Sequence, residues 1–203
     1  ISFEAASYGA KVAELLGTTA DGIVLGNVNY DLPSLGAYGL KKLHYFKNPE
    51  LNNLDAQVFT TIIGEAAERI GANVIIFSNN ADGKAIAPRL SVKLKAGLVS
   101  GALALPDVSN GFVVKKNVFS GKAFANVSVS TEKKIISLNP NSYKINKGEG
   151  IAEVIEPGIT VPSSKVKVTA VNKVVGEIPL SEAELVVSGG RGLKGQENWN
   201  FVT

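Results

Sequence analysis

The chain has no cysteine and only one histidine, His44, among its 203 residues. The lack of cysteine excludes disulfides, thiolate nucleophiles, cysteine-ligated metals and redox dithiols. A single histidine excludes a histidine-rich metal centre, and no set of residues resembles a general acid and base pair. We therefore predict no catalytic residue and no metal site.

Long apolar runs and clusters of one charge are also missing. The longest nearly apolar stretch, residues 96–106, contains Ser100 and is too short to span a bilayer. Lysine and arginine exceed aspartate and glutamate by 21 to 18, but the excess is spread over isolated pairs such as Lys115 and Lys116. Nucleic-acid surfaces need clustered basic residues interleaved with aromatics. We expect no nucleic-acid partner and no membrane-embedded segment.

The first half of the chain alternates between helical and strand patterns. A helix is predicted over 2–16 with Ser2 as its N-cap, and the clearest helical stripe covers 55–70. The other predicted elements are strands at 22–26, 42–46 and 74–77, a weak helix from Asp31, and a helix at 85–94 after a polar loop. This alternation predicts an α/β fold, specifically a three-layer Rossmann-like domain with a mainly parallel sheet.

The second half is richer in strands. Strands are predicted at 112–119, 123–130, 135–138 and 165–175, and the alternation over 123–130 indicates a half-buried antiparallel sheet. Residues 176–179 have the composition of a linker. We therefore predict an N-terminal α/β domain over 1–179 and the start of a second domain over 180–203.

A glycine-rich loop near the end of the chain is the strongest candidate for a binding site. An apolar run at 184–188, predicted to be a buried strand, leads into Gly189, and Gly190, Gly192 and Gly195 follow with G-x-G-x-x-G spacing. Glycines let the backbone present N–H groups to an anion, and Arg191 adds a permanent positive charge. The alternative is a tight connection between a strand and a helix that carries a surface arginine.

Other motifs carry less weight. Asp82, Gly83 and Lys84 do not form a phosphate-binding P-loop, because Ser78 stands where its first glycine is required and Ala85 where it needs Ser or Thr. His44 is predicted to be structural or on the surface.

Several segments together resemble the α subunit of electron transfer flavoprotein. They are residues 83–90 (GKAIAPRL), 119–123 (FSGKA), 138–141 (LNPN) and, most specifically, 183–199 (AELVVSGGRGLKGQENW). They occur in the order and at about the spacing of that family. The family normally has a strand before the first helix and further FAD motifs after the glycine loop. Neither is present in these 203 residues, which also lack methionine and open in a helical pattern. We expect the natural start to precede Ile1.

The resemblance implies an FAD-dependent electron carrier rather than an enzyme with its own substrate. It implies a heterodimer with a β subunit, acyl-CoA and other dehydrogenases as electron donors, and a quinone reductase or other acceptor. This portion would act mainly as a scaffold and β-subunit interface, with FAD absent or incompletely bound. Fatty acid β-oxidation in the cytoplasm, or in the mitochondrial matrix of a eukaryote, is the expected setting.

By the same resemblance, Arg191 is an FAD contact, and Gly189 and Gly190 shape its loop. A guanidinium about 4 Å from a reduced flavin contributes on the order of 4 kcal/mol at an effective dielectric constant near 20. Contact with the phosphates would change affinity rather than potential, and both alternatives stay open. Two other functions are also open, namely a nucleotide-binding α/β hydrolase-like domain and a cofactor-free assembly module.

Overall fold

The computed structural model describes residues 1–172, 176, 180, 183 and 185–201. The chain divides into two compact units, Ile1–Val171 and Asn172–Thr203. The predicted boundary between residues 179 and 180 adjoins residues 177–179 and 181–182, which lie outside the described residues.

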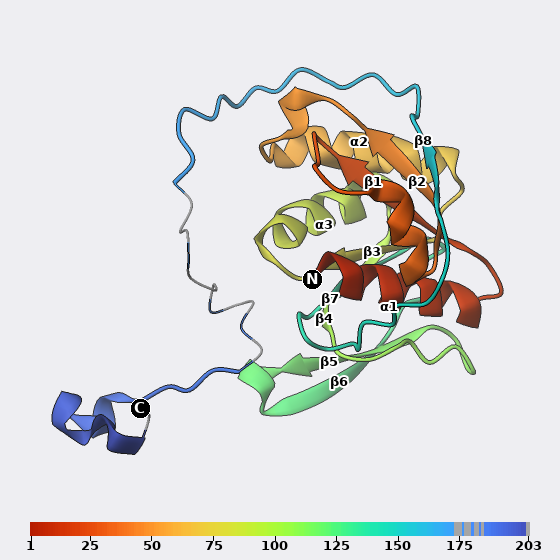
Figure 1. Cartoon of the computed structure of the whole chain (residues 1–203). Coiled ribbons are helices and arrows are strands. Elements are labelled where there is room, and N and C mark those ends of the chain that lie inside the picture. The colour runs from red at the N-terminus through yellow and green to blue at the C-terminus, as the bar shows by residue number, and fades with distance from the viewer. Residues whose placement is uncertain (173–175, 177–179, 181–182, 184, 202–203) are drawn as a thin grey trace. The chain divides into compact units, whose positions relative to one another are not determined.

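The first unit begins with alternating helices and strands (Figure 1). These elements are α1 (Ser2–Leu15), β1 (Ala20–Leu25), η1 (Leu32–Tyr38), β2 (Leu40–Phe46), η2 (Pro49–Leu51), α2 (Ala56–Arg69), β3 (Val74–Ser78) and α3 (Ala81–Leu94). Strands then dominate, as β4 (Gly97–Ala102), β5 (Val113–Val118), η3 (Phe119–Gly121), β6 (Ala123–Ser128), β7 (Lys134–Leu138) and β8 (Glu153–Ile155). The weak helix predicted from Asp31 is the 3-10 helix η1, and β4 lies in a stretch where no strand was predicted.

Hydrogen bonding divides the described strands into two sheets. One has the order β3-β7-β4-β5-β6, in which β7 runs parallel to β3 and β4, and β5 and β6 form an antiparallel hairpin. The other has the order β1-β2-β8 and is parallel throughout. The predicted α/β class, with parallel pairing and antiparallel strands in the second half, is confirmed.

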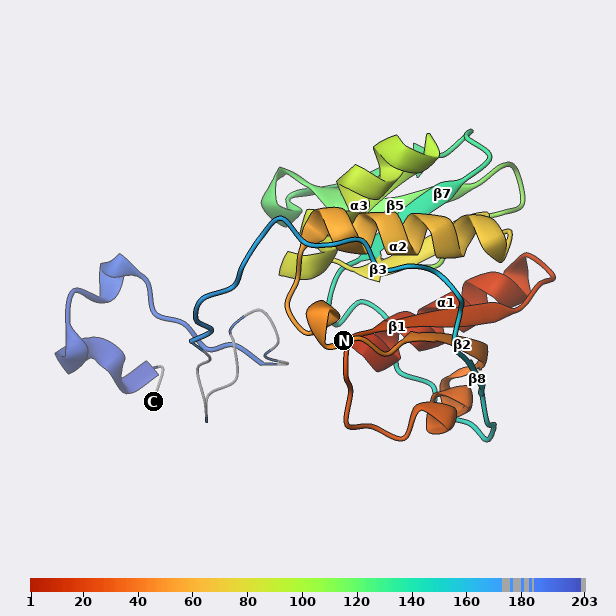
Figure 2. The same ribbon diagram turned by 90° about the horizontal axis from the view of Figure 1, so that it is seen from above.

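Two neighbouring residues of β7 show why the domain has three layers. Successive strand residues point to opposite faces of a sheet. Ile136 packs with Tyr8 and Val12 of α1, whereas Ile135 packs with Leu90 and other residues of α2 and α3. Figure 2 shows α2 and α3 lying side by side along the sheet. The sheet is therefore covered by α1 on one face and by α2 and α3 on the other.

The strands β1 and β3 each have one edge without a strand partner among the described residues. β1 pairs only with β2, and β3 pairs only with β7. Every residue of both strands is half-buried, while four of the five residues of β7 are buried. The helix α1 contacts both β1 and β3, so it packs against both sheets.

Two predicted helix starts are wrong. Asn80 caps α3 by accepting a hydrogen bond from the Gly83 N–H at 2.9 Å, so the helix begins at Ala81 rather than at Ala85. Residues 81–84, which were predicted to belong to a polar loop, are the first turn of the helix. Ser2 already lies inside α1, where its side chain makes no capping hydrogen bond, and Ile1 takes the N-cap position.

The strand predicted over 165–175 does not form in the described part, residues 165–172, and 173–175 lie outside the described residues. Val166 and Val168 supply the apolar positions of the alternating pattern, but they are 61% and 42% exposed. Alternation alone does not make a strand, because a strand also needs a neighbour to satisfy its backbone and cover one face.

Candidate cofactor site

The predicted glycine loop lies in the second unit and contains two short 3-10 helices, η5 (Arg191–Leu193) and η6 (Gln196–Phe201). The Leu193 N–H donates to the Gly190 carbonyl at 3.0 Å, and the Gly195 N–H donates to the Leu193 carbonyl at 2.7 Å. The Asn198 side chain donates to the same Leu193 carbonyl at 2.9 Å. These local bonds give the loop a defined backbone without any contribution from a sheet.

The buried strand predicted before this loop is wrong for residues 185–188, which form no strand; Glu184 lies outside the described residues. Leu185 is 84% exposed and Val187 is 64% exposed. None of the described strands pairs with this segment, so its apolar side chains have no sheet face to cover. The G-x-G-x-x-G spacing therefore follows an irregular segment rather than a buried strand.

Local packing does not require glycine at two positions of the loop, Gly190 and Gly192. A Cβ added at Gly190 or Gly192 would meet no atom within 4 Å, and neither residue has a positive φ. Gly189, just before them, is exposed. Packing within the described residues does not explain why positions 190 and 192 are glycine. Close approach of another molecule is a use of glycine that remains consistent with this open space.

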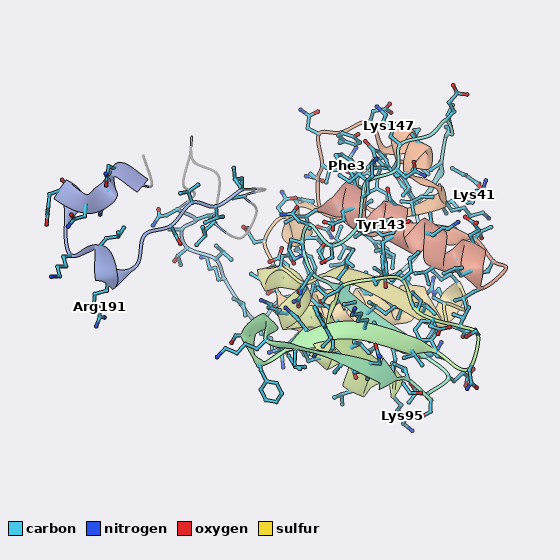
Figure 3. All side chains as sticks on the ribbon, turned by 90° about the horizontal axis from the view of Figure 1, so that it is seen from below. Phe3, Lys41, Lys95, Tyr143, Lys147 and Arg191 are labelled. Atoms are coloured by element: carbon cyan, nitrogen blue, oxygen red, sulfur yellow. The ribbon has the colours of Figure 1, made fainter. Side chains whose placement is uncertain are left out.

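Arg191 projects from the outer side of its turn (Figure 3). Its guanidinium is exposed and has no ion pair or hydrogen bond among the described residues. The backbone N–H groups of Gly190, Arg191 and Gly192 likewise donate to no described acceptor. The loop thus combines a fixed positive charge with free N–H donors, a set that suits anionic oxygens.

His44 is buried and forms a pair with an aspartate in the first unit. Its side chain is on β2, and its Nε2 lies 3.1 Å from Oδ2 of Asp21 on the neighbouring strand β1. The residue is only 7% exposed. Of the two predicted alternatives, a structural or a surface histidine, the structure shows the structural one, because the carboxylate satisfies the buried imidazole.

The segment rejected as a P-loop begins α3. A Cβ at Gly83 would collide with the Ser78 carbonyl, so glycine is needed here to pack the first helical turn on the end of β3. Packing alone accounts for this glycine. The sequence analysis did not identify this role. The available signal was the position of the glycine, three residues after the capping residue Asn80, where the helix backbone passes close to the end of β3.

Polar side chains at the carboxyl ends of β3, β7 and β4 were missed as a group. Asn79 Nδ2 donates to Asn139 Oδ1 at 2.7 Å, and the hydroxyls of Ser137 and Ser100 donate to Asn79 Oδ1 at 3.1 and 3.2 Å. Each residue lies in or directly after a strand, which is the available sequence signal. Because these side chains bind one another, their evident role is to join the strand ends.

A shallow hollow of about 440 Å³ opens at the carboxyl ends of β2 and β8. Phe46 and Ile159 contribute apolar surface to it, and Lys47 and Glu156 contribute charges of opposite sign. No group of three or more His, Asp or Glu side chains in the described part of the chain could hold a metal ion. In that same part, no helix is both long enough and apolar enough to cross a membrane.

Comparison with known proteins gives a consistent result. The sequence model of the electron transfer flavoprotein domain matches residues 1–171. The chain is 28% identical over 209 residues to the electron transfer flavoprotein subunit alpha of Bacillus subtilis (strain 168), covering 98% of this chain and 62% of the relative. The corresponding subunit of Syntrophomonas wolfei is 26% identical over 203 residues, with the same coverage of each chain.

A third relative, from Acetobacterium woodii, is named as a subunit of lactate dehydrogenase (NAD(+),ferredoxin); it is 22% identical over 209 residues, which cover 100% of this chain and 50% of the relative. The chain thus spans 62% of the length of the first two curated relatives. Because the domain match extends over most of its residues, the chain belongs to the electron transfer flavoprotein family.

Proposed function

We propose that this chain is part of the alpha subunit of an FAD-dependent electron carrier that works together with a beta subunit. In this proposal the first unit is the scaffold and partner interface, and the glycine loop contributes to an FAD site completed by further polypeptide. The observation that carries the proposal is the exposed Arg191 beside three free backbone N–H groups in a chain of this family.

The described residues fit the anionic part of FAD better than its ring. Backbone N–H groups and a guanidinium are strong donors to phosphate oxygens. Because glycine has no Cβ, the loop leaves room for those oxygens to approach its backbone. When bound, FAD would supply the redox chemistry. Arg191 would hold a positive charge against it, with Gly189 and Gly190 allowing close approach. A charge held beside the ring instead would favour the reduced cofactor and raise its potential.

The electron donors are proposed as a class, namely acyl-CoA and other dehydrogenases, and a quinone reductase or similar protein is the proposed acceptor. One relative is named as a subunit of a lactate dehydrogenase, whereas others are named as electron transfer flavoprotein subunits. The donor is therefore proposed as a class of dehydrogenases rather than as one enzyme. The relatives described above are bacterial, which supports a cytoplasmic carrier. The absence of any recognisable acid and base pair in the sequence supports a carrier rather than an enzyme.

The test replaces Arg191 in the complete alpha subunit co-produced with its beta subunit. Loss of a charged hydrogen-bond donor costs about 1.5–3 kcal/mol, so Arg191→Ala should weaken FAD binding roughly tenfold or more. Lys194→Ala, in the same loop, is the matched control for removing a positive charge. Flavin content and redox potential are both measured. Wild-type values of both in Arg191→Ala would refute the proposed role of Arg191.

The same measurement separates the two remaining uses of Arg191. A lower flavin content with an unchanged potential indicates contact with the phosphates. A lowered potential at full flavin content indicates that the guanidinium lies near the ring. A wild-type complex that holds no flavin at all would contradict the carrier function itself.

A further inference from the structure

The hairpin β5–η3–β6 carries an unusual concentration of exposed aromatic surface. Phe119, in η3 at its tip, is 78% exposed, and Phe124, on β6, is 63% exposed. Among the phenylalanines whose side chains are described, only these two are exposed. Removing apolar side chains from water is favourable, so this hairpin leaves a large apolar surface that a partner could bury.

The backbone at the tip is strained. Phe119, Ser120 and Gly121 have φ values of 51°, 54° and 85°, in the left-handed region. Glycine enters this region freely, whereas a bulky residue such as phenylalanine rarely does. Phe119 therefore costs free energy twice, because its ring is exposed to water and its backbone is in an unfavourable conformation. Backbone strain of this kind concentrates at functional sites.

The sequence around these rings is positively charged, and one lysine contacts a ring. Residues 108–131 contain three lysines, Lys115, Lys116 and Lys122, and no aspartate or glutamate. The Lys115 ammonium lies 4.4 Å from the centroid of the Phe124 ring, a distance typical of a cation–π contact. None of the three lysines makes an ion pair among the described residues.

The exposed side of the hairpin belongs to the same face of the sheet that α3 covers over the neighbouring strands. Val114 is fully buried on the α1 side, so its neighbour Lys115 points to the opposite side. On that side α3 packs against β3, β7 and β4, while Phe124, Asn126 and Ser128 of β6 are all exposed. β6 is also the edge strand of its sheet. The hairpin is therefore held by β5–β6 hydrogen bonds, while its outer face remains uncovered.

We propose that this hairpin surface, defined by Lys115, Phe119, Lys122 and Phe124, is the docking surface for the beta subunit, through apolar pockets rimmed by acidic residues. The inference rests on the proposed function and adds the site of contact to it. Exposed aromatic anchors beside cationic side chains are typical of residues that dominate protein interfaces. A second copy of this chain is disfavoured because a two-fold contact would set lysines against lysines.

The test measures the affinity of the complete alpha subunit for separately produced beta subunit. We expect Phe119→Gly and Phe124→Ala each to weaken binding at least tenfold. Val92→Ala is the matched control, since Val92 is 81% exposed on α3, and its affinity should stay within twofold of wild type. Phe119→Gly suits the left-handed backbone, so its unfolding midpoint should not fall, which separates lost contact from lost structure.

Charge reversal tests the electrostatic part. Lys115→Glu should slow association several-fold and flatten the dependence of the association rate on salt, whereas Lys41→Glu, at an exposed position on β2, should not. Unchanged affinity of both phenylalanine variants for the beta subunit overturns the inference. It is also overturned if Phe119→Gly loses binding to phosphatidylserine vesicles but still binds the beta subunit normally. A wild-type complex that contains flavin shows that the carrier function stands even then, and a complete absence of any complex overturns both proposals.

Discussion

The buried carboxylate of Glu4, on α1, accepts a hydrogen bond from the backbone N–H of Ser142 at 2.8 Å. The same carboxylate accepts hydrogen bonds from the N–H groups of Asn141 and Tyr143, at 3.1 and 2.9 Å. A single side chain thus binds three successive peptide groups after β7. The contact joins residues separated by well over half of the chain and fixes the loop after β7 against α1.

We expect Glu4→Gln to lower the free energy of unfolding by about 2–3 kcal/mol. The amide keeps the size of the side chain but loses the charge and one of the two acceptor oxygens, which leaves buried N–H groups poorly satisfied. Urea unfolding of both proteins measures the difference. Glu14→Gln, on the same helix but exposed and paired only with Lys11, should change stability little. Equal midpoints for wild type and Glu4→Gln would contradict this role.

Replacement of Gly83 by alanine should destabilise the first unit by about 1–3 kcal/mol, even though alanine favours helices. The reason is the collision of the new Cβ with the Ser78 carbonyl, a backbone atom that cannot move without disturbing the end of β3. Thermal unfolding provides the measurement. Gly158→Ala is the control, because a Cβ there meets no atom within 4 Å. A Gly83→Ala protein as stable as the Gly158→Ala protein would refute the packing argument.

The N-cap of α2 should make stability depend on pH. The Ser164 hydroxyl and the backbone N–H groups of Gln57 and Val58 lower the pKa of the Asp55 carboxyl below its ordinary value. A lowered folded-state pKa stabilises the fold above the unfolded pKa, near 3.9, and this contribution is lost as pH falls through the folded value. The difference in unfolding free energy between wild type and Asp55→Asn should therefore be constant from neutral pH to about pH 5 and shrink below it.

Ser164→Ala is the companion variant for that experiment. It removes the hydroxyl that contributes most to the shift but keeps the carboxylate and the two backbone donors. We expect the pH-dependent part of the difference to become smaller and the capping contribution at neutral pH to remain. A difference between wild type and Asp55→Asn that does not change between pH 7 and pH 3 would exclude a lowered pKa at Asp55.

Amide hydrogen exchange should separate the interior strand β7 from β3. Every residue of β7 lies between two parallel neighbours, whereas β3 has one edge with no strand partner among the described residues. In a parallel sheet alternate N–H groups point to opposite edges, so about half of the β3 amides should exchange much faster than those of β7. NMR detection resolves the individual amides. Uniform protection along β3 would show that its open edge is covered in solution.

The sequence correctly predicted those elements in which the hydrophobic pattern and the residues at the ends indicate the same structure. The helical stripe over 55–70 corresponds to α2, and Asp55 caps that helix by accepting hydrogen bonds from the N–H groups of Gln57 and Val58. The alternation over 123–130 corresponds to β6, whose residues alternate between half-buried and exposed. The strand predicted at 165–175 from a similar alternation, and the one predicted at 184–188 from an apolar run, have no strand partners in their described parts. Their failure shows that pairing is a property of the whole fold.

The cofactor role of Arg191, Gly189 and Gly190 stays a prediction. The composition of the loop around Arg191 pointed to anion binding, and the described residues supply free N–H donors and an unpaired guanidinium. The docking surface was not foreseen, although Phe119 belongs to a segment quoted for the family resemblance. Exposure of Phe119 and Phe124 cannot be read from composition, because the same residues would be core if another layer covered β6.

The sequence by itself determined the α/β class, the positions of most helices and strands, and the family, because these depend on local periodicity, capping residues and short motifs. Only the tertiary structure decided which strands pair, that Glu4 binds the loop after β7, that Gly83 is needed at the start of α3, and that two phenylalanines stay in water. These depend on contacts between residues far apart in the chain, whose free energies exist only once the layers have packed.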